Sequence, residues 1–137
     1  MTTTRKIRHQ IEYLFTRGVG TLVQILPYNA AIFIGSFLGD LAFSLLRIRR
    51  KVAIDNLKRA FGKTYTEKEF KKIAREAYRN IGRGFVEYAM FPVLKNRLDK
   101  LVEFEGLENF DKALKDRKGA VLIAGHFGSW ELMGAAT

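Results

Sequence analysis

The feature that most constrains this fold is a short apolar run at residues 120–124, flanked by glycines. Such a run is typical of a strand that is covered on both faces in a parallel sheet. Residues 101–105 alternate as an edge strand does. Residues 107–118 have the spacing of a helix that turns Leu107, Phe110 and Leu114 inward and ends at a glycine. The sequence therefore predicts an α/β fold in which these three segments form a βαβ unit.

The residues after the predicted strand carry the candidate chemistry. His126 and Glu131 are five positions apart, so a helix would set them about 140° apart and a strand would place them on opposite faces. A turn can bring them together, and Gly125 and Gly128 favour a turn. Ser129 is predicted to be a helix N-cap, which places Glu131 in the first helical turn, where the helix dipole favours an ionised carboxylate.

An ionised Glu131 can accept a hydrogen bond from one imidazole N–H of His126 and leave the other ring nitrogen free as a base. This is a two-residue version of the base and its orienting group in hydrolytic triads. The alternative is a satisfied, partly buried histidine at a strand end, but the surrounding glycines and Glu131 favour catalysis. A metal site is not expected, because the only other histidine is His9 and there is no cysteine.

Residues 125–132, Gly-His-Phe-Gly-Ser-Trp-Glu-Leu, resemble the His-x4-Asp/Glu motif of glycerolipid-type acyltransferases. The stretch is most similar to the bacterial late acyltransferases of lipid A biosynthesis, the lauroyl and myristoyl transferases, which usually have Asn in place of Ser129. A second stretch resembles the segment that follows the membrane anchor of those enzymes. Together the two stretches correspond to the family's N-terminal portion. The second stretch consists of Arg49-Arg50-Lys51, Asn56-Leu57 and Ala60-Phe61.

The resemblance implies a cofactor-independent O-acyltransferase with a glycerolipid-acyltransferase-like fold. Its donor would be an acyl carrier protein or CoA thioester, and its acceptor a hydroxyl of a lipid A precursor or a related glycolipid. His126 and Glu131 would be the catalytic pair. Gly128, Ser129 and Trp130, which neighbour this pair in the sequence, are predicted to bind substrate, with a packing role as the alternative for Trp130. The resemblance also implies a location at the bacterial inner membrane, with the active site facing the cytoplasm.

Residues 1–50 are expected to form a membrane-associated helical segment. Residues 11–26 have the spacing of an interfacial helix. Residues 28–46 are apolar except for Asp40, and as a helix they would cover about 28 Å, close to the ~30 Å hydrocarbon core. Asp40 would then need a partner. A helix buried in a soluble core and a hairpin in one leaflet are the alternatives.

Residues 51–137 are expected to form the N-terminal part of an acyltransferase domain. A helix at residues 52–61 is predicted to turn Val52, Leu57 and Phe61 inward. The capping box at residues 66–69 opens a second helix, which Pro92 ends. Its apolar stripe is predicted to be mostly core, with part of it available to floor a lipid groove. The stripe consists of Phe70, Ile73, Ala74, Ala77, Tyr78, Ile81, Phe85 and Tyr88.

The net charge of +10 is unevenly distributed: residues 1–63 carry +8, residues 64–100 carry +4 and residues 101–137 carry −2. A basic excess around an apolar segment favours an anionic membrane as partner. Nucleic acid is not an expected partner, because no nucleic-acid-binding motif is present. The second helix also bears a basic face, either simply solvated or suited to phospholipid headgroups or an acidic carrier protein. That face consists of Lys71, Lys72, Arg75, Arg79 and Arg83.

A second hypothesis is a non-catalytic membrane-binding module, or an inactive fragment, in which His126 is structural. A parallel strand needs a neighbouring strand, and only about two helical turns follow Ser129. We therefore expect the sequence to be a truncated fold.

Overall fold

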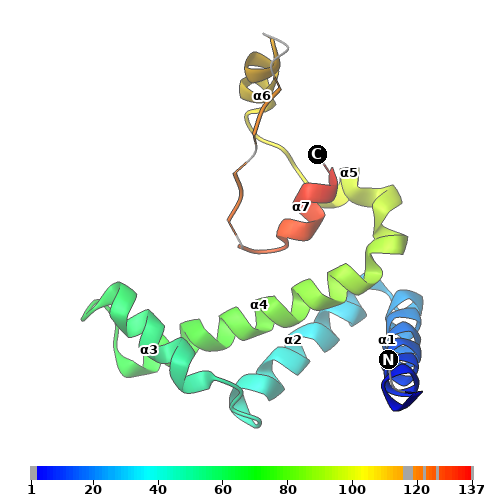
Figure 1. Cartoon of the computed structure of the whole chain (residues 1–137). Helices are drawn as coiled ribbons and strands as arrows, with labels where there is room; N and C mark the ends of the chain where they lie inside the picture. The colour runs from blue at the N-terminus through cyan, green and yellow to red at the C-terminus, as the bar shows by residue number, and fades with distance from the viewer. Residues whose placement is uncertain (1–2, 116–118, 122, 126, 137) are drawn as a thin grey trace.

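The computed structural model describes residues 3–115, 119–121, 123–125 and 127–136. The described segments are helices joined by loops and one short 3-10 turn, η1 (Figure 1). The helices are α1 (Thr3–Ile25), α2 (Tyr28–Ser44), α3 (Arg50–Phe61), α4 (Glu67–Leu94), α5 (Leu98–Leu101), α6 (Leu107–Leu114) and α7 (Trp130–Ala136), and η1 spans Lys95–Arg97.

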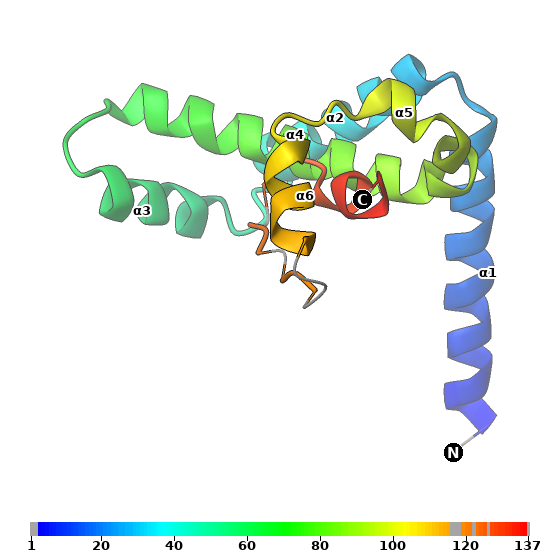
Figure 2. The same cartoon turned by 90° about the horizontal axis from the view of Figure 1, so that it is seen from above.

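The centre of the molecule is a pair of helices, α2 and α4, that lie side by side (Figure 1). They are antiparallel, because the start of α2 contacts the later part of α4 and the end of α2 contacts its beginning. Tyr28 donates a hydrogen bond to Glu87 at 2.7 Å, and Arg75 donates to Asp40 at 2.7 Å. Helix α1 extends away from this pair, with the N-terminus at its far end (Figure 2).

Glycines allow α2 and α4 to approach closely. A Cβ atom added to Gly82 of α4 would lie 2.1 Å from the carbonyl oxygen of Gly35. A Cβ added to Gly39 of α2 would lie 2.2 Å from the carbonyl oxygen of Tyr78. Real Cβ atoms do not come so near, so the two backbones touch where a larger residue would separate them.

The buried face of α4 follows a spacing of four residues rather than 3.6. Four residues advance the helix by about 400°, so this row turns around the axis by about 40° at each step. Ile81, Phe85 and Tyr88, which the 3.6-residue period assigned to the stripe, are 56%, 74% and 67% exposed. The buried residues of α4 are Phe70, Ala74, Val86, Met90 and Leu94.

Two apolar clusters form along this row. At the N-terminal half of α4, Phe70 and Ala74 pack with Phe43 of α2 and Ile54 of α3. At the C-terminal half, α4 packs with residues of α2 and α7. This second cluster consists of Ala31, Val86, Met90, Leu94 and Leu132.

The predicted start of α4 is confirmed, because Thr66 and Glu69 form both hydrogen bonds of a capping box. The predicted end is wrong, since Pro92 lies inside the helix, which continues to Leu94. A proline there removes the partner of the Tyr88 carbonyl.

The predicted α/β fold with a βαβ unit is wrong. In the described part of the chain, neither residues 101–105 nor residues 120–124 form a strand. Val121 is 92% exposed and Ile123 is 95% exposed, so the described residues of the apolar run are not buried. A strand exists only where another backbone segment pairs with it, and no described segment does so here.

The prediction of membrane-anchoring helices is also wrong. No helix within the described ranges is long and apolar enough to cross a membrane. Helix α2 has 17 residues, and one of its faces packs against α4. Asp40 does have the partner that the sequence required, because Arg75 contacts both of its carboxylate oxygens, at 2.7 and 2.9 Å.

Two predictions of inward-facing side chains also fail in part. In α3, Leu57 is partly buried, but Val52 and Phe61 are 45% and 46% exposed. The buried residue of α3 is Ile54. The predicted inner face of α6 is exposed, and the end of that predicted helix, residues 116–118, lies outside the described residues. The exposed side chains of α6 are Leu107, Phe110 and Leu114.

Candidate functional site

The described residues just before α7 bend the chain, as the predicted turn requires. The N–H of Phe127 donates a hydrogen bond to the carbonyl of Gly125 at 2.8 Å. Gly128 has a φ of +62°, a conformation that favours glycine. Ser129 directly precedes α7, and Glu131 lies in its first turn, as predicted.

Ser129 occupies the cap position, but its side chain does not cap the helix. Its carbonyl oxygen accepts hydrogen bonds from the N–H groups of Leu132 at 3.1 Å and Met133 at 3.2 Å. Its hydroxyl is buried and has no hydrogen-bond partner among the described residues. The predicted helix start is therefore right, and the predicted side-chain cap is wrong.

Leu132 fixes α7 against the long helix. It is 5% exposed and packs in the cluster that includes Val86 and Met90 of α4. On a helix, consecutive side chains point about 100° apart. Burial of Leu132 therefore sets the direction of its neighbour Glu131, which is partly buried at the edge of a groove.

This groove is the candidate site. It has a volume of about 530 Å³ and lies between α4 and the start of α7. One wall comes from the α4 side chains that the core does not use, and the other comes from the predicted motif. The lining residues are Ala77, Asn80, Ile81, Gly84, Phe85, Phe127, Gly128, Trp130 and Glu131.

A second hollow of about 480 Å³ extends the groove towards the start of α4. The two share Ala77, Asn80 and Phe127, so they form one continuous surface depression. From Ile73 to Phe85 the depression follows α4 for about 18 Å. Both hollows expose mostly apolar surface, with Glu131 lining the first and Glu69, Lys72 and Glu76 lining the second. The depression therefore suits a ligand with a long apolar part and polar groups beside it.

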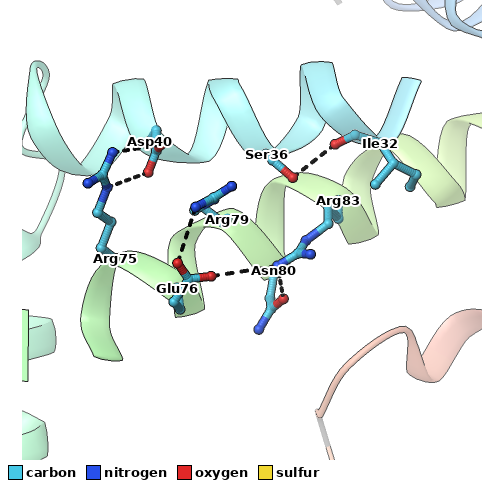
Figure 3. Close-up of polar contacts among 8 residues, drawn as sticks. All are labelled: Ile32, Ser36, Asp40, Arg75, Glu76, Arg79, Asn80 and Arg83. Atoms are coloured by element: carbon cyan, nitrogen blue, oxygen red, sulfur yellow. Dashed lines mark hydrogen bonds and ion pairs between the residues drawn. The ribbon is translucent and has the colours of Figure 1, made fainter. Parts of the chain in front are cut away.

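Charged residues beside the groove are paired with one another (Figure 3). Glu76 contacts Arg79 at 3.2 Å and Arg83 at 3.9 Å. Arg83 also donates to Asn80 at 2.6 Å. With Arg75 bound to Asp40, three of the five cations on the predicted basic face have ion-pair partners on the protein.

The structure brings together Gly128, Trp130 and Glu131 in the groove, while Ser129 does not line it. His126 lies outside the described residues, so its pairing with Glu131 stays a prediction. Phe127, which the sequence analysis did not assign to the site, joins both parts of the groove. Its place inside the motif was the available signal.

In the part of the chain that the structure describes, no three acidic, histidine or cysteine side chains gather as metal ligands would. The groove offers one carboxylate, from Glu131, and no nitrogen ligand from the described residues. The Glu131 carboxylate can accept a hydrogen bond from a group beside it in the groove.

Comparison with known proteins identifies the family. The family model of the bacterial lipid A biosynthesis acyltransferases matches residues 1–136. The chain belongs to this family. The resemblance of residues 125–132 to the late acyltransferases is thereby confirmed at the level of the family.

Individual relatives agree with this assignment. The lipid A biosynthesis palmitoleoyltransferase of Escherichia coli (strain K12) is 34% identical over 137 positions, covering 96% of this chain and 44% of the relative. The lauroyltransferase of the same organism is 29% identical over 129 positions, covering 90% of this chain and 41% of the relative. This family member thus spans less than half the length of these relatives. No solved structure matches it significantly.

Proposed function

We propose that the protein is a membrane-associated O-acyltransferase. It would move a fatty acyl chain from an acyl carrier protein or CoA thioester to a hydroxyl of a lipid A precursor or a related glycolipid, at the cytoplasmic face of the bacterial inner membrane. The observation that carries the proposal is the apolar groove with the Glu131 carboxylate at its edge. The family match supports the reaction class.

The proposed chemistry is general base catalysis by His126. The imidazole takes the proton of the acceptor hydroxyl as its oxygen attacks the thioester carbonyl. Glu131 holds the other ring nitrogen in its protonated form and stabilises the imidazolium. When the tetrahedral intermediate collapses, the carbon–sulfur bond breaks, and the imidazolium gives its proton to the departing thiolate.

The groove suits the proposed acyl donor. Ile81 and Phe85 present apolar surface on α4, and Phe127 and Trp130 present it on the opposite wall. Burial of an acyl chain along such surface is favourable by about 25 cal/mol per Å². Binding of the chain would place the thioester carbonyl near Glu131.

The test is acyl transfer by the full-length protein from a radiolabelled thioester to the glycolipid acceptor. His126→Ala should lower kcat by about 100- to 10,000-fold. Glu131→Gln should lower kcat more than it changes KM. Glu108→Gln is the matched control, because Glu108 also lies in the first turn of a short helix but does not line the groove. Near wild-type transfer by folded His126→Ala protein would refute the assignment.

The alternative is a non-catalytic membrane-binding module. It is favoured by the apolar side chains that α1 leaves exposed, which include Leu14 at 65% and Phe15 at 72%. If the wild-type protein transfers no acyl group and still binds membranes, this alternative replaces the enzyme.

A further inference from the structure

A basic pocket lies where the loop at residues 45–49 meets α3 and α4. Its volume is about 570 Å³, and it shares no lining residue with the groove beside Glu131. Its wall holds one carboxylate, from Asp55, against five cations. The lining residues are Arg47, Arg50, Lys51, Ile54, Asp55, Lys58 and Lys71.

Most of these cations lack a carboxylate partner. Lys58 forms an ion pair with Glu67. Within the described ranges, no acidic side chain lies in ion-pair contact with the other four. The Arg50 guanidinium instead lies 4.7 Å from the centroid of the Phe43 ring. The pocket therefore differs from the face of α4 shown in Figure 3, whose arginines are neutralised.

The N-terminus of α3 adds to the positive potential. Arg50 and Lys51 occupy its first turn, which contains no acidic residue. The N-cap residue, Arg49, makes no side-chain hydrogen bond to the helix. Cations at this end of a helix oppose the dipole, so an anion bound there would relieve the repulsion. The Arg50 N–H already donates to the Arg47 carbonyl at 3.3 Å, so the anion would accept from the N–H groups that follow it.

The loop that carries Arg47, one of the five cations, is held in a strained shape. Arg47 and Arg49 have φ values of +51° and +48°, a region that L side chains rarely adopt. The Tyr78 hydroxyl donates to the carbonyl of Ile48 and ties the loop to α4. The pocket is thus formed before any ligand arrives.

The same loop exposes apolar side chains next to its arginines. Leu45 is 71% exposed, Leu46 is 60% exposed and Ile48 is 51% exposed. A small soluble anion would not cover these apolar side chains, and an acidic protein surface would also leave them exposed to water. A bilayer accepts both groups, with cations at the phosphates and apolar side chains just below them.

We propose that this pocket binds the phosphate of an anionic phospholipid headgroup while Leu45, Leu46 and Ile48 enter the membrane interface. The proposal rests on the proposed membrane association and adds the site that recognises the lipid. It concerns a surface separate from the groove, so binding and acyl transfer can be measured independently.

The test is sedimentation of the full-length protein with vesicles of phosphatidylcholine alone or mixed with phosphatidic acid. The pocket variant combines Arg47→Gln, Arg50→Gln and Lys51→Gln. The control variant removes the same charge from a helical segment outside the pocket, and circular dichroism checks that both variants fold. The control consists of Lys95→Gln, Arg97→Gln and Lys100→Gln.

The wild type should bind the mixed vesicles more tightly than phosphatidylcholine, and salt should weaken the binding. The pocket variant should lose about 100-fold in affinity, at roughly 5-fold for each cation near an anionic surface. The control should lose less than about 5-fold. Equal losses in the two variants would overturn the proposal, because net charge alone would then explain the binding.

Two further arms identify the source of the anion. Calorimetry with inorganic phosphate should show much weaker binding than vesicles do, and tight binding of free phosphate without vesicle binding would overturn the lipid assignment. The lipid assignment would also be overturned if the three substitutions weakened binding to an acidic carrier protein but left vesicle binding unchanged. Acyl transfer to a detergent-dispersed acceptor should persist in the pocket variant, and its absence in the wild type would count against the proposed function alone.

Discussion

Substitution of Gly82 by alanine tests the close approach of α2 and α4. The added Cβ would lie 2.1 Å from the Gly35 carbonyl oxygen and 3.1 Å from the backbone nitrogen of Gly39. All of these atoms belong to backbone, so no side-chain rotation can relieve the overlap. The helices would have to separate by about 1 Å to restore a normal contact.

The expected cost follows from two opposing effects. Overpacking of this kind destabilises a protein by about 1–3 kcal/mol. Replacing glycine by alanine inside a helix stabilises the helix by up to about 1 kcal/mol, because alanine has the higher helix propensity. Gly82→Ala should therefore lower the free energy of unfolding by about 1–2 kcal/mol, or the melting temperature by about 4 °C per kcal/mol.

Gly84→Ala is the matched control, because Gly84 lies on the same helix and an added Cβ would meet nothing within 4 Å. It should raise the stability by up to about 1 kcal/mol. The assay is urea unfolding followed by circular dichroism. The m-value, which is the slope of the unfolding free energy against urea concentration, should be the same in each variant. If Gly82→Ala is as stable as Gly84→Ala, the backbones of α2 and α4 do not touch at this point.

Two further predictions concern the start of α4 and its ion pair with α2. Thr66→Ala should lower the free energy of unfolding by about 1 kcal/mol in the same urea assay, because it removes the N-cap acceptor; no loss would contradict the capping box. The hydrogen bond from Arg75 holds the pKa of Asp40 below its usual 3.8. The ionised Asp40 carboxylate therefore adds to the free energy of unfolding above pH 3.8. This contribution is lost as the pH falls through the lower pKa that Asp40 has in the folded state. The stability difference between wild type and Asp40→Asn should therefore shrink in acid, and a difference that stays constant would contradict the pairing.

The sequence predicted those elements whose cause is local. Thr66 and Glu69 announce the start of α4 because a capping box needs only four consecutive residues. The core face of α4 was harder to predict, because its contact with α2 runs through Gly82, which has no side chain to count as apolar. Periodicity assigned Ile81 and Phe85 to the core, although they line the groove. The sequence also predicts that part of this apolar stripe can form the floor of a lipid groove, which agrees with the position of these two residues.

The predicted strand failed for a different reason. The composition of residues 120–124 describes what a buried strand contains, but pairing depends on a second segment that no local pattern specifies. For the candidate site, the sequence predicted the helix that carries Glu131, whereas the predicted chemistry depends on a second residue. Glu131 lies in the first turn of α7 as expected, while its partnership with His126 stays a prediction.

The burial of Leu132 links two properties that are usually considered apart. The same cluster that holds α7 in place, through Val86 and Met90, also determines where the neighbouring carboxylate of Glu131 points. If Glu131 acts in catalysis as proposed, a mutation that leaves a void under Leu132 would inactivate a well-folded protein without touching any group that meets the substrate. In a screen for lost activity, such mutants would look like active-site mutants, and refilling the void from the opposite helix should restore them.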